Sequence, residues 1–362
     1  MSKFNLEDFV NATVLGAYWE EYNRNVGDPY VGSTLFPSRR SNNTNMSMMK
    51  GTKGLPVVLQ PSTYDTKAPL RDKIGFSRIE YGMPFFREAA QIGEKERQEL
   101  VRMLAYGDES IKTFIPYIYD QLTPLLDGAE TAMERMRMEA LANGSFLVRA
   151  SVETGRSVEY SMNYDVDGSW TTNNKFELTG TDTWTAANAS TNDPIGDLIS
   201  IKDQIMDYNG GNPTRVLLTS ATLRNMLQSE SIKKMINPLY FDSMRFSRLD
   251  LQRQVEEEAG LTFITYDKMF VDEENNTKKF YPDNQITLLP GGAVGASVYG
   301  VTPEELDLMT SNNHRATVSV VNPGITITSW REEHPVNIST VVSAVMMPSF
   351  ENIDDVFVVK VA

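Results

Sequence analysis

The alternating run that begins at Asn163 is the part of the sequence that most resembles a ligand site. Asn163, Asp165 and Asp167 precede Gly168 in the order of the oxygen donors in the first half of an EF-hand calcium loop. The twelfth position of such a loop supplies a bidentate glutamate, whereas here it is Asn174. The flanking residues alternate as they do in strands, so we expect a polar turn closed by Asx hydrogen bonds. Asp165→Ala should then leave folding and assembly nearly unchanged in the presence of a chelator.

The glycine-rich segment 290–295 is the stretch that most resembles a phosphate-binding loop. It lacks the Gly-Lys-Ser/Thr ending, so no lysine is placed to bind a phosphate and no hydroxyl group is placed to bind magnesium. We therefore expect an ordinary glycine-rich loop and no cofactor.

Side chains for acid–base or nucleophilic catalysis are sparse. His314 and His334 are the two histidines of the chain, and neither lies in a recognisable zinc or Ser-His-Asp motif. The acidic run Glu256–Glu258 falls in an expected helix, where charged residues usually form a solvated face. We predict no catalytic residue and no metal site. A hydrolase with paired carboxylates brought together from distant positions is the least favoured alternative.

The composition is that of a globular protein with an excess of acidic residues. The 362 residues are 41% hydrophobic and 23% charged, enough for one large domain or two of ordinary size. The 48 acidic and 34 basic residues give a net charge of −14, which speaks against a main role in wrapping nucleic acid. The absence of cysteine excludes disulfides and thiolate metal sites. No apolar run of about 18 residues and no secretory leader is evident, so we expect neither a membrane span nor secretion.

The strongest helix pattern runs from about Ile118 to Asn143. Apolar residues recur there at three- and four-residue steps, and Gly144 follows where a helix would end in a left-handed residue. Pro116 and Pro124 should limit or kink its amino-terminal end, and its length should be roughly 35–40 Å. The apolar stripe, which we interpret as a packing face, comprises Ile118, Leu122, Leu125, Ala129, Met133, Met136 and Ala140.

Strand patterns follow this helix. Residues 146–152 and 158–162 alternate with period two, which predicts an antiparallel hairpin. Residues 193–290 mix helix and strand patterns, as is typical of an α+β domain. Near the carboxyl end, three apolar segments favour strands: 325–328, 336–345 and 356–361.

Two segments near the amino terminus show no core of their own. Residues 1–50 contain an apolar stripe for one short helix and then a stretch rich in Ser, Asn and Gly, and we interpret them as an arm. Residues 51–90 contain two extended runs around a polar tip, which predicts a long hairpin-like loop. We expect both segments to find their core on another subunit; a flexible surface loop is the alternative for the second. Four charged residues of the loop tip are expected to contact the neighbouring subunit: Lys67, Arg71, Asp72 and Lys73.

The order of these elements resembles that of the major capsid proteins of tailed bacteriophages. More closely, the chain resembles the lambda-type major head protein family, which has the HK-ninety-seven-like fold. The resemblance is residue-specific toward the carboxyl end. It rests on Asn275-Asn276, Lys278-Lys279 and Phe280-Tyr281-Pro282-Asp283-Asn284, and on Ser343-Ala344, Pro348, Asp355, Phe357, Val358 and Ala362.

The resemblance implies an α+β capsid fold in five parts. These are an N-terminal arm at 1–50, an extended loop at 51–90, a peripheral domain with a long spine helix and a hairpin at 91–167, an axial domain at 168–325, and C-terminal strands at 326–362 that return to the peripheral domain.

The resemblance also implies a function. The chain would assemble with itself, as hexamers and pentamers, into the icosahedral shell around the double-stranded DNA of a tailed phage. Expected partners are a portal and a decoration protein. Scaffolding would be a separate protein, or already absent, because residues 1–50 leave room only for a short arm. DNA would lie on the inner face without sequence-specific binding. The protein is expected in the virion, after synthesis and assembly in the bacterial host cytoplasm.

Two other functions stay open on the sequence alone. An encapsulin-like nanocompartment would have the same fold and differ in its contents, which would be an enzyme cargo instead of DNA. A calcium- or carbohydrate-binding surface protein would be built around residues 163–174.

Overall fold

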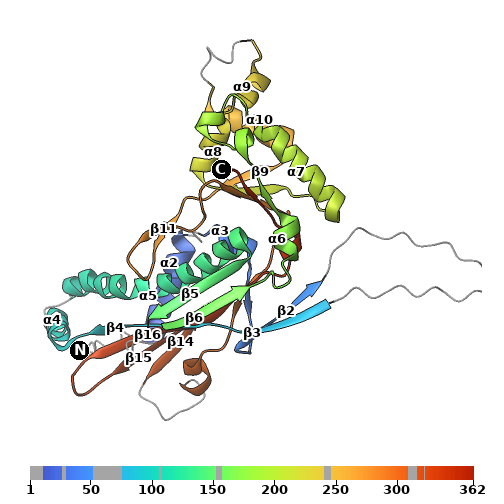
Figure 1. The fold of residues 1–362 in the computed structure, drawn as a ribbon. Coiled ribbons are helices and arrows are strands. Elements are labelled where there is room, and N and C mark those ends of the chain that lie inside the picture. The colour runs from blue at the N-terminus through green and yellow to red at the C-terminus, as the bar shows by residue number, and fades with distance from the viewer. Residues whose placement is uncertain are drawn as a thin grey trace, which may run out of the picture. The chain divides into compact units, whose positions relative to one another are not determined.

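The computed structural model describes residues 11–26, 30–51, 76–105, 108–151, 157–239, 246–308, 316–321 and 323–362. The chain divides into two compact units (Figure 1). Unit 1 comprises Met1–Ser47, Glu80–Arg137 and Ala296–Ser349, and unit 2 comprises Met48–Ile79, Met138–Gly295 and Phe350–Ala362. Each unit therefore combines segments that are far apart in the sequence, and the expected five-part division of the chain stays a prediction.

Helix α5 (Asp108–Asn143) confirms the predicted long helix and extends it at the amino-terminal end. Its 36 residues correspond to about 54 Å at about 1.5 Å per residue. The expectation that the two prolines limit the helix is wrong, because α5 continues through Pro116 and Pro124. Pro124 lies at an exposed position of the helix. Gly144 follows with φ 73°, the left-handed conformation expected at the end of the helix.

The apolar stripe of α5 is a packing face, as predicted. Its members from Leu122 onward are at most 9% exposed.

A six-stranded sheet organises unit 1. Its strands are β1 (Ser38–Arg40), β4 (Phe85–Ile92), β13 (Ala296–Tyr299), β14 (Thr317–Val321), β15 (Ile325–Arg331) and β16 (Ile338–Ser349). Strands β4, β13 and β15 all pair antiparallel with β16, and every residue of β16 is buried. The central position of β16 explains its apolar sequence, because both faces of the strand are covered.

The helical elements of unit 1 are short apart from the first part of α5. They are α2 (Ala12–Val26), α3 (Val31–Leu35), α4 (Glu94–Ala105) and the π-helical turn η3 (Glu304–Leu308). Helix α2 packs on β14 and β15.

The described part of the amino-terminal arm is buried in its own chain, which corrects the expectation that its core is another subunit. Leu15 and Trp19 of α2 are 4% and 3% exposed, and Leu35 and Phe36 are fully buried. The indole nitrogen of Trp19 donates to the carboxylate of Asp127 on α5 at 3.2 Å. Sequence alone could not place these apolar residues, because their partners lie about a hundred or more positions away.

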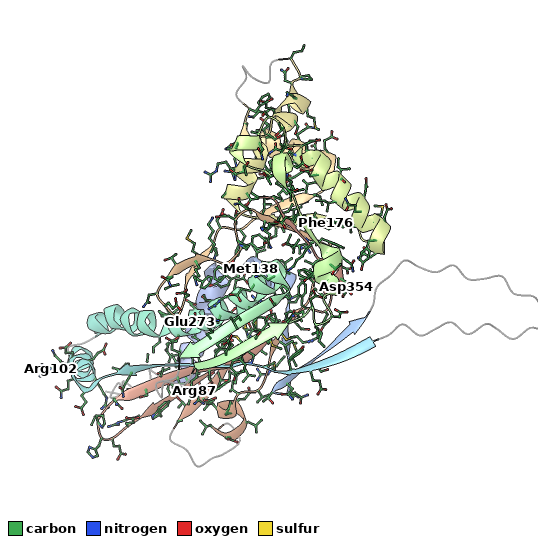
Figure 2. The ribbon with its side chains drawn as sticks, viewed as in Figure 1. Arg87, Arg102, Met138, Phe176, Glu273 and Asp354 are labelled. Atoms are coloured by element: carbon green, nitrogen blue, oxygen red, sulfur yellow. The ribbon has the colours of Figure 1, made fainter. Side chains whose placement is uncertain are left out.

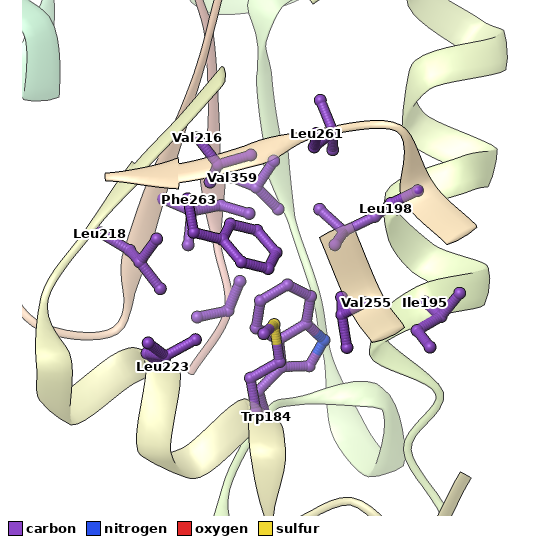
Figure 3. Packing of buried hydrophobic residues seen from close by; sticks show 14 of the residues in the cluster. Trp184, Ile195, Leu198, Val216, Leu218, Leu223, Val255, Leu261, Phe263 and Val359 are labelled. Carbon is purple, nitrogen blue, oxygen red and sulfur yellow. The ribbon is translucent and has the colours of Figure 1, made fainter. Parts of the chain in front are cut away.

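Unit 2 contains a five-stranded sheet with helices packed on it. The strands, in sheet order, are β7 (Lys175–Glu177), β17 (Phe357–Lys360), β12 (Gln285–Leu289), β8 (Arg215–Leu218) and β9 (Thr262–Thr265). The helices are α7 (Pro194–Asn209), α8 (Ser220–Leu227), α9 (Glu230–Ile236) and α10 (Arg248–Ala259). The indole of Trp184 points into the core, among residues such as Val216 and Phe263 (Figure 3). These elements confirm the α+β pattern predicted for residues 193–290.

Three two-stranded hairpins or ribbons complete the fold. They are β2 (Asn45–Gly51) with β3 (Phe76–Gly82), β5 (Ser145–Ser151) with β6 (Ser157–Asn163), and β10 (Met269–Val271) with β11 (Thr277–Lys279). The pair β5–β6 confirms the hairpin predicted after the long helix. Short helical elements of unit 2 are α6 (Ser169–Asn174), η1 (Gly180–Asp182), η2 (Ala186–Asn188) and η4 (Ile353–Asp355).

Candidate functional site

The ribbon of β2 and β3 bounds the segment that was predicted to contact a neighbouring subunit (Figure 1). Lys67, Arg71, Asp72 and Lys73 lie outside the described residues, so their role stays a prediction. The start of the ribbon is fixed within unit 1. The amide of Met83, which follows β3, donates to the carbonyl oxygen of Thr44 at 3.0 Å.

A buried ion pair on α5 anchors the amino-terminal segment. Glu134 and Arg137 are 0% and 1% exposed, and Oε2 of Glu134 lies 3.2 Å from Nη1 of Arg137. The other oxygen of Glu134 accepts the amide of Gly32 at 3.0 Å, and Nε of Arg137 donates to the hydroxyl of Ser297 at 2.8 Å. That hydroxyl donates in turn to the carbonyl of Phe36 at 2.8 Å. The network joins the segment around α3 to α5 and β13 within unit 1.

This pair was not predicted from the sequence, although the pattern of α5 contains a signal for it. Position 137 lies four residues after Met133 and three before Ala140, so Arg137 falls on the apolar stripe. A charged residue there, with Glu134 three residues earlier, indicates a buried pair because isolated charges are rarely buried. No local pattern predicts the other partners, since they come from α3 and β13.

Two further ion pairs hold η3 to strands of unit 1. Arg87 of β4 pairs with Glu304, and Arg40 of β1 pairs with Glu305. The hydroxyl of Ser343 on β16 also donates to Glu304 at 3.0 Å. Figure 2 labels Arg87. Its side chain is 51% exposed, so solvent screens its pair more than it screens the pair on α5.

The run from Asn163 to Asn174 is a capped turn of helix in unit 2. The two carboxylate oxygens of Asp165 accept the amides of Trp170 and Thr171, each at 2.8 Å, at the start of α6. The side chain of Asn174 is buried and donates to the carbonyl of Val356 at 3.0 Å. Asp165 and Asn174, the residue at the twelfth position of the loop, are thus both hydrogen-bonded to the backbone of the protein. This arrangement supports the predicted polar turn, with a helical turn that the prediction did not contain.

Asp165→Ala is now expected to destabilise unit 2, which corrects the expectation drawn from the sequence. The substitution leaves two amides at the start of α6 without their acceptor, a loss typically worth about 1 kcal/mol in the free energy of unfolding. Urea unfolding with and without chelator measures this loss, which should be the same in both conditions. A loss that appears only when calcium is present would contradict the capping role.

The stability difference between wild type and Asp165→Ala should depend on pH in one direction. Burial raises the pKa of Asp165, but hydrogen bonds from Thr171 and Trp170 outweigh it and hold the pKa below its usual value. A lowered folded-state pKa contributes stability above the unfolded pKa, and this contribution disappears as the pH falls through the folded pKa. The difference between wild type and Asp165→Ala should therefore be constant from neutral pH to about pH 5 and shrink below about pH 4.

The two other segments considered for chemistry are bound by the chain's own groups. The guanidinium of Arg215 donates to the carbonyl oxygens of Pro290 at 2.6 Å and Gly292 at 2.5 Å, which closes the glycine-rich loop. In the acidic run, Glu257 and Glu258 are exposed as predicted, whereas Glu256 is half-buried and its carboxylate accepts the amide of Phe263 at 3.0 Å. Both arrangements are structural.

Metal ligation and membrane insertion have no support in the described part of the chain. His334 is exposed, and His314 lies outside the described residues. Among the described residues, no group of three or more His, Asp or Glu side chains is arranged to hold a metal ion. No helix in the same ranges is both long and apolar enough to cross a bilayer.

The residues near 280 that carry the resemblance to capsid proteins form a packed turn before β12. Tyr281 is fully buried, with its hydroxyl 2.6 Å from that of Thr287. The carboxylate of Asp283 accepts the hydroxyl of Thr219 at 2.6 Å. Asn284 adopts φ 61°, a left-handed conformation that asparagine tolerates better than most residues. The motif is therefore a packing and turn signature, with no catalytic arrangement.

The sequence matches the phage major capsid protein E family over residues 11–361. This chain belongs to that family. As a phage major capsid protein it is a structural, shell-forming protein of the virion that assembles with copies of itself. The family match gives no support to the encapsulin-like alternative or to the calcium- or carbohydrate-binding one.

Solved structures show the fold of this capsid protein independently. A prophage protein of Escherichia coli CFT073, assigned as a capsid protein, aligns with a TM-score of 0.59 at 14% identity, over 97% of this chain and 99% of that chain. A phage-related protein of Bordetella bronchiseptica RB50 aligns with a TM-score of 0.51 at 12% identity, over 97% of each chain. These likenesses confirm the predicted α+β, HK-ninety-seven-like fold. No curated protein sequence is significantly similar to the chain.

Proposed function

We propose that this capsid protein forms, as hexamers and pentamers, the icosahedral shell that encloses the double-stranded DNA of a tailed phage. The observation that carries the proposal is the family match over residues 11–361. The net charge of −14 is consistent with a wall that lies near DNA without wrapping it, because tight phosphate binding needs a basic surface. Contact with DNA would then be independent of sequence.

The proposal includes the domain roles that the resemblance implies. Residues 91–167 would form the peripheral domain, and they contain α5 and the β5–β6 hairpin. Residues 168–325 would form the axial domain, and they contain four of the five strands of the unit 2 sheet. The carboxyl-terminal strands would return to the peripheral domain, whose residues 91 and 92 pair with β16 at the end of β4, whereas β17 joins β12 in unit 2.

The part of the extended loop at 51–90 that precedes β4 is proposed to lie on a neighbouring subunit, because residues 85–90 pair with β16 in the sheet of their own unit. Strands β2 and β3 pair with each other on the two sides of the loop tip, which supports a hairpin-like course. Lys67, Arg71, Asp72 and Lys73 are then the proposed contact residues.

Assembly is proposed to take place in the bacterial host cytoplasm, with a portal, a separate scaffolding protein and a decoration protein as further partners. We assign no catalytic activity to the chain. In support, Asp165, Arg215 and Glu256 are engaged in hydrogen bonds that stabilise the fold.

Particle formation by the purified full chain tests the proposed function. Expression with and without a co-expressed scaffolding protein should give closed shells, seen by light scattering and negative-stain microscopy. Only monomers of 40.7 kDa at high concentration, with scaffolding protein supplied, would contradict the proposal. The contents of particles purified from infected cells then distinguish packaged DNA from an enzyme cargo.

A further inference from the structure

The outer face of α7 in unit 2 combines exposed apolar and acidic side chains. Ile199 and Met206 are 39% and 47% exposed, and Asp203 and Asp207 are exposed beside them. Asp203 follows Ile199 by four residues, and Met206 and Asp207 follow Asp203 by three and four. The four side chains therefore lie on one side of the helix. We call them the α7 face.

A second surface of unit 2, where α9 packs against α10, combines exposed apolar and basic side chains. Leu239 is 84% exposed, the highest value among the exposed apolar residues of the described chain, and Leu249 and Met235 are 63% and 42% exposed. Arg248 is exposed and Lys233 is half-exposed. We call these five residues the α9–α10 tip.

The carboxyl-terminal end of α7 lies away from the α9–α10 tip of its own molecule (Figure 1). Helix α7 begins beside α9, because the amide of Glu230 donates to the carbonyl of Ala189 at 2.7 Å and the hydroxyl of Ser229 donates to the carbonyl of Asn192 at 3.0 Å. Asp207 is about 20 Å further along the helix axis than Pro194. Figure 1 shows α7 running away from α9.

We propose that the α7 face of one copy binds the α9–α10 tip of the next copy, in a head-to-tail contact around the ring of a hexamer or pentamer. This inference rests on the proposed function, which it extends to particular residues. An apolar centre with charged residues at the rim is typical of protein interfaces. A head-to-tail contact between identical chains closes into a ring when its rotation closes.

The charges decide between this arrangement and a symmetric one. Contact between two α7 faces would bring Asp203 and Asp207 of both copies together, and contact between two tips would bring Lys233 and Arg248 together. Both arrangements place like charges in an interface, which is costly. The head-to-tail contact instead places acidic residues against basic ones.

The neighbouring charged residues do not change the acidic character of the α7 face or the basic character of the α9–α10 tip. Lys234 of α9 is paired with Glu230 at 2.9 Å, and Lys202 of α7 donates to the carbonyl of Ala259 at 3.1 Å. Asp250 is exposed in the first turn of α10, where a carboxylate stabilises the helix end.

A charge exchange between the two surfaces tests the contact. The variant Asp203→Lys/Asp207→Lys and the variant Lys233→Glu/Arg248→Glu should each fold normally by circular dichroism, and each should lower the yield of particles by about tenfold or more. The variant that combines all four substitutions should restore particles, because opposite charges again face each other. The matched control is Glu257→Lys/Glu258→Lys, which makes the same charge change at exposed positions near the other end of α10 and should assemble normally.

The outcomes separate this inference from the proposed function. If the wild-type chain forms no shells, the proposed function fails. If wild-type shells form and either reversal also assembles normally, or the combined variant stays as defective as its folded parents, the head-to-tail contact is overturned while the shell function stands.

The absence of cysteine from the chain allows a second, independent measurement. In mildly oxidised particles, the double variant Asp207→Cys/Leu239→Cys should give a ladder of disulfide-linked oligomers on non-reducing gels. Each single variant should remain monomeric there, because a head-to-tail contact never brings two copies of the same residue together. Dimers from a single variant, or no ladder from the double variant in intact shells, would overturn the proposal.

Discussion

The double variant Arg71→Glu/Lys73→Glu is expected to fold normally by circular dichroism and to form few or no particles at low salt. The two residues belong to the proposed contact of the extended loop with a neighbouring subunit. Reversal of their charge would place like charges together in that contact, which can cost several kcal/mol. The cost recurs at every equivalent contact of a symmetric shell. On a free surface loop the same change would alter stability by only a few tenths of a kcal/mol.

Salt and a conservative variant make the test of the loop specific. High salt screens repulsion between exposed charges, so particles should reappear as the ionic strength rises. The control Arg71→Lys/Lys73→Arg keeps both positive charges and should assemble like the wild type. A normal yield of Arg71→Glu/Lys73→Glu shells at low salt would rule out the loop contact and leave the family assignment intact.

Local periodicity predicted the elements whose core is formed by neighbouring turns or strands. The mixed helix and strand pattern predicted for residues 193–290 is confirmed by elements such as α7 and β8, because their apolar residues face one shared core in unit 2. The same holds for α5, where the apolar stripe continues through the described part of the helix. Proline misled the prediction at its amino-terminal end, because α5 continues through Pro116 and Pro124.

Elements that depend on distant partners were missed. Strand β4 was not predicted because only Ile92 of its eight residues is buried, so its sequence has no period-two pattern. Its conformation comes from pairing with β16, which lies about 250 positions later in the chain. Helix α6 was read as a polar turn because Ser, Thr and Asn favour helices weakly. It forms where Asp165 caps its first amides and Trp170 is buried.

The same limit applies to the candidate functional residues. The family motif near Asp283 was visible in the sequence because a turn requires particular residues at fixed spacing. The α7 face and the α9–α10 tip carry no motif, and their residues become recognisable only when exposure is known. The buried pair of Glu134 and Arg137 was predictable only in part. The position of Arg137 on the apolar stripe of α5 indicates that it is buried, but it does not show which residues it contacts.

Arg137→Met is expected to lower the free energy of unfolding of the unassembled chain by about 3–5 kcal/mol, because it leaves the buried carboxylate of Glu134 without the guanidinium beside it. Urea unfolding followed by circular dichroism measures the loss. The control is Lys234→Met, which breaks an ion pair with Glu230 whose side chains are 46% and 33% exposed. An exposed pair of this kind contributes less than about 1 kcal/mol. Equal losses in the two variants would contradict the burial of the pair on α5.

The combined variant Glu134→Gln/Arg137→Met separates the cost of an uncompensated charge from the loss of the contacts themselves. Replacing both charges removes the buried carboxylate, so much of the stability lost in Arg137→Met should return. The glutamine can still accept the amide of Gly32, whereas the bond from Arg137 to Ser297 is absent in both variants. Hydrogen exchange should therefore show residues 31–36 loosened in Arg137→Met and partly protected again in the combined variant. Equal loosening in both variants would mean that Ser297, and not the charge of Glu134, holds this segment.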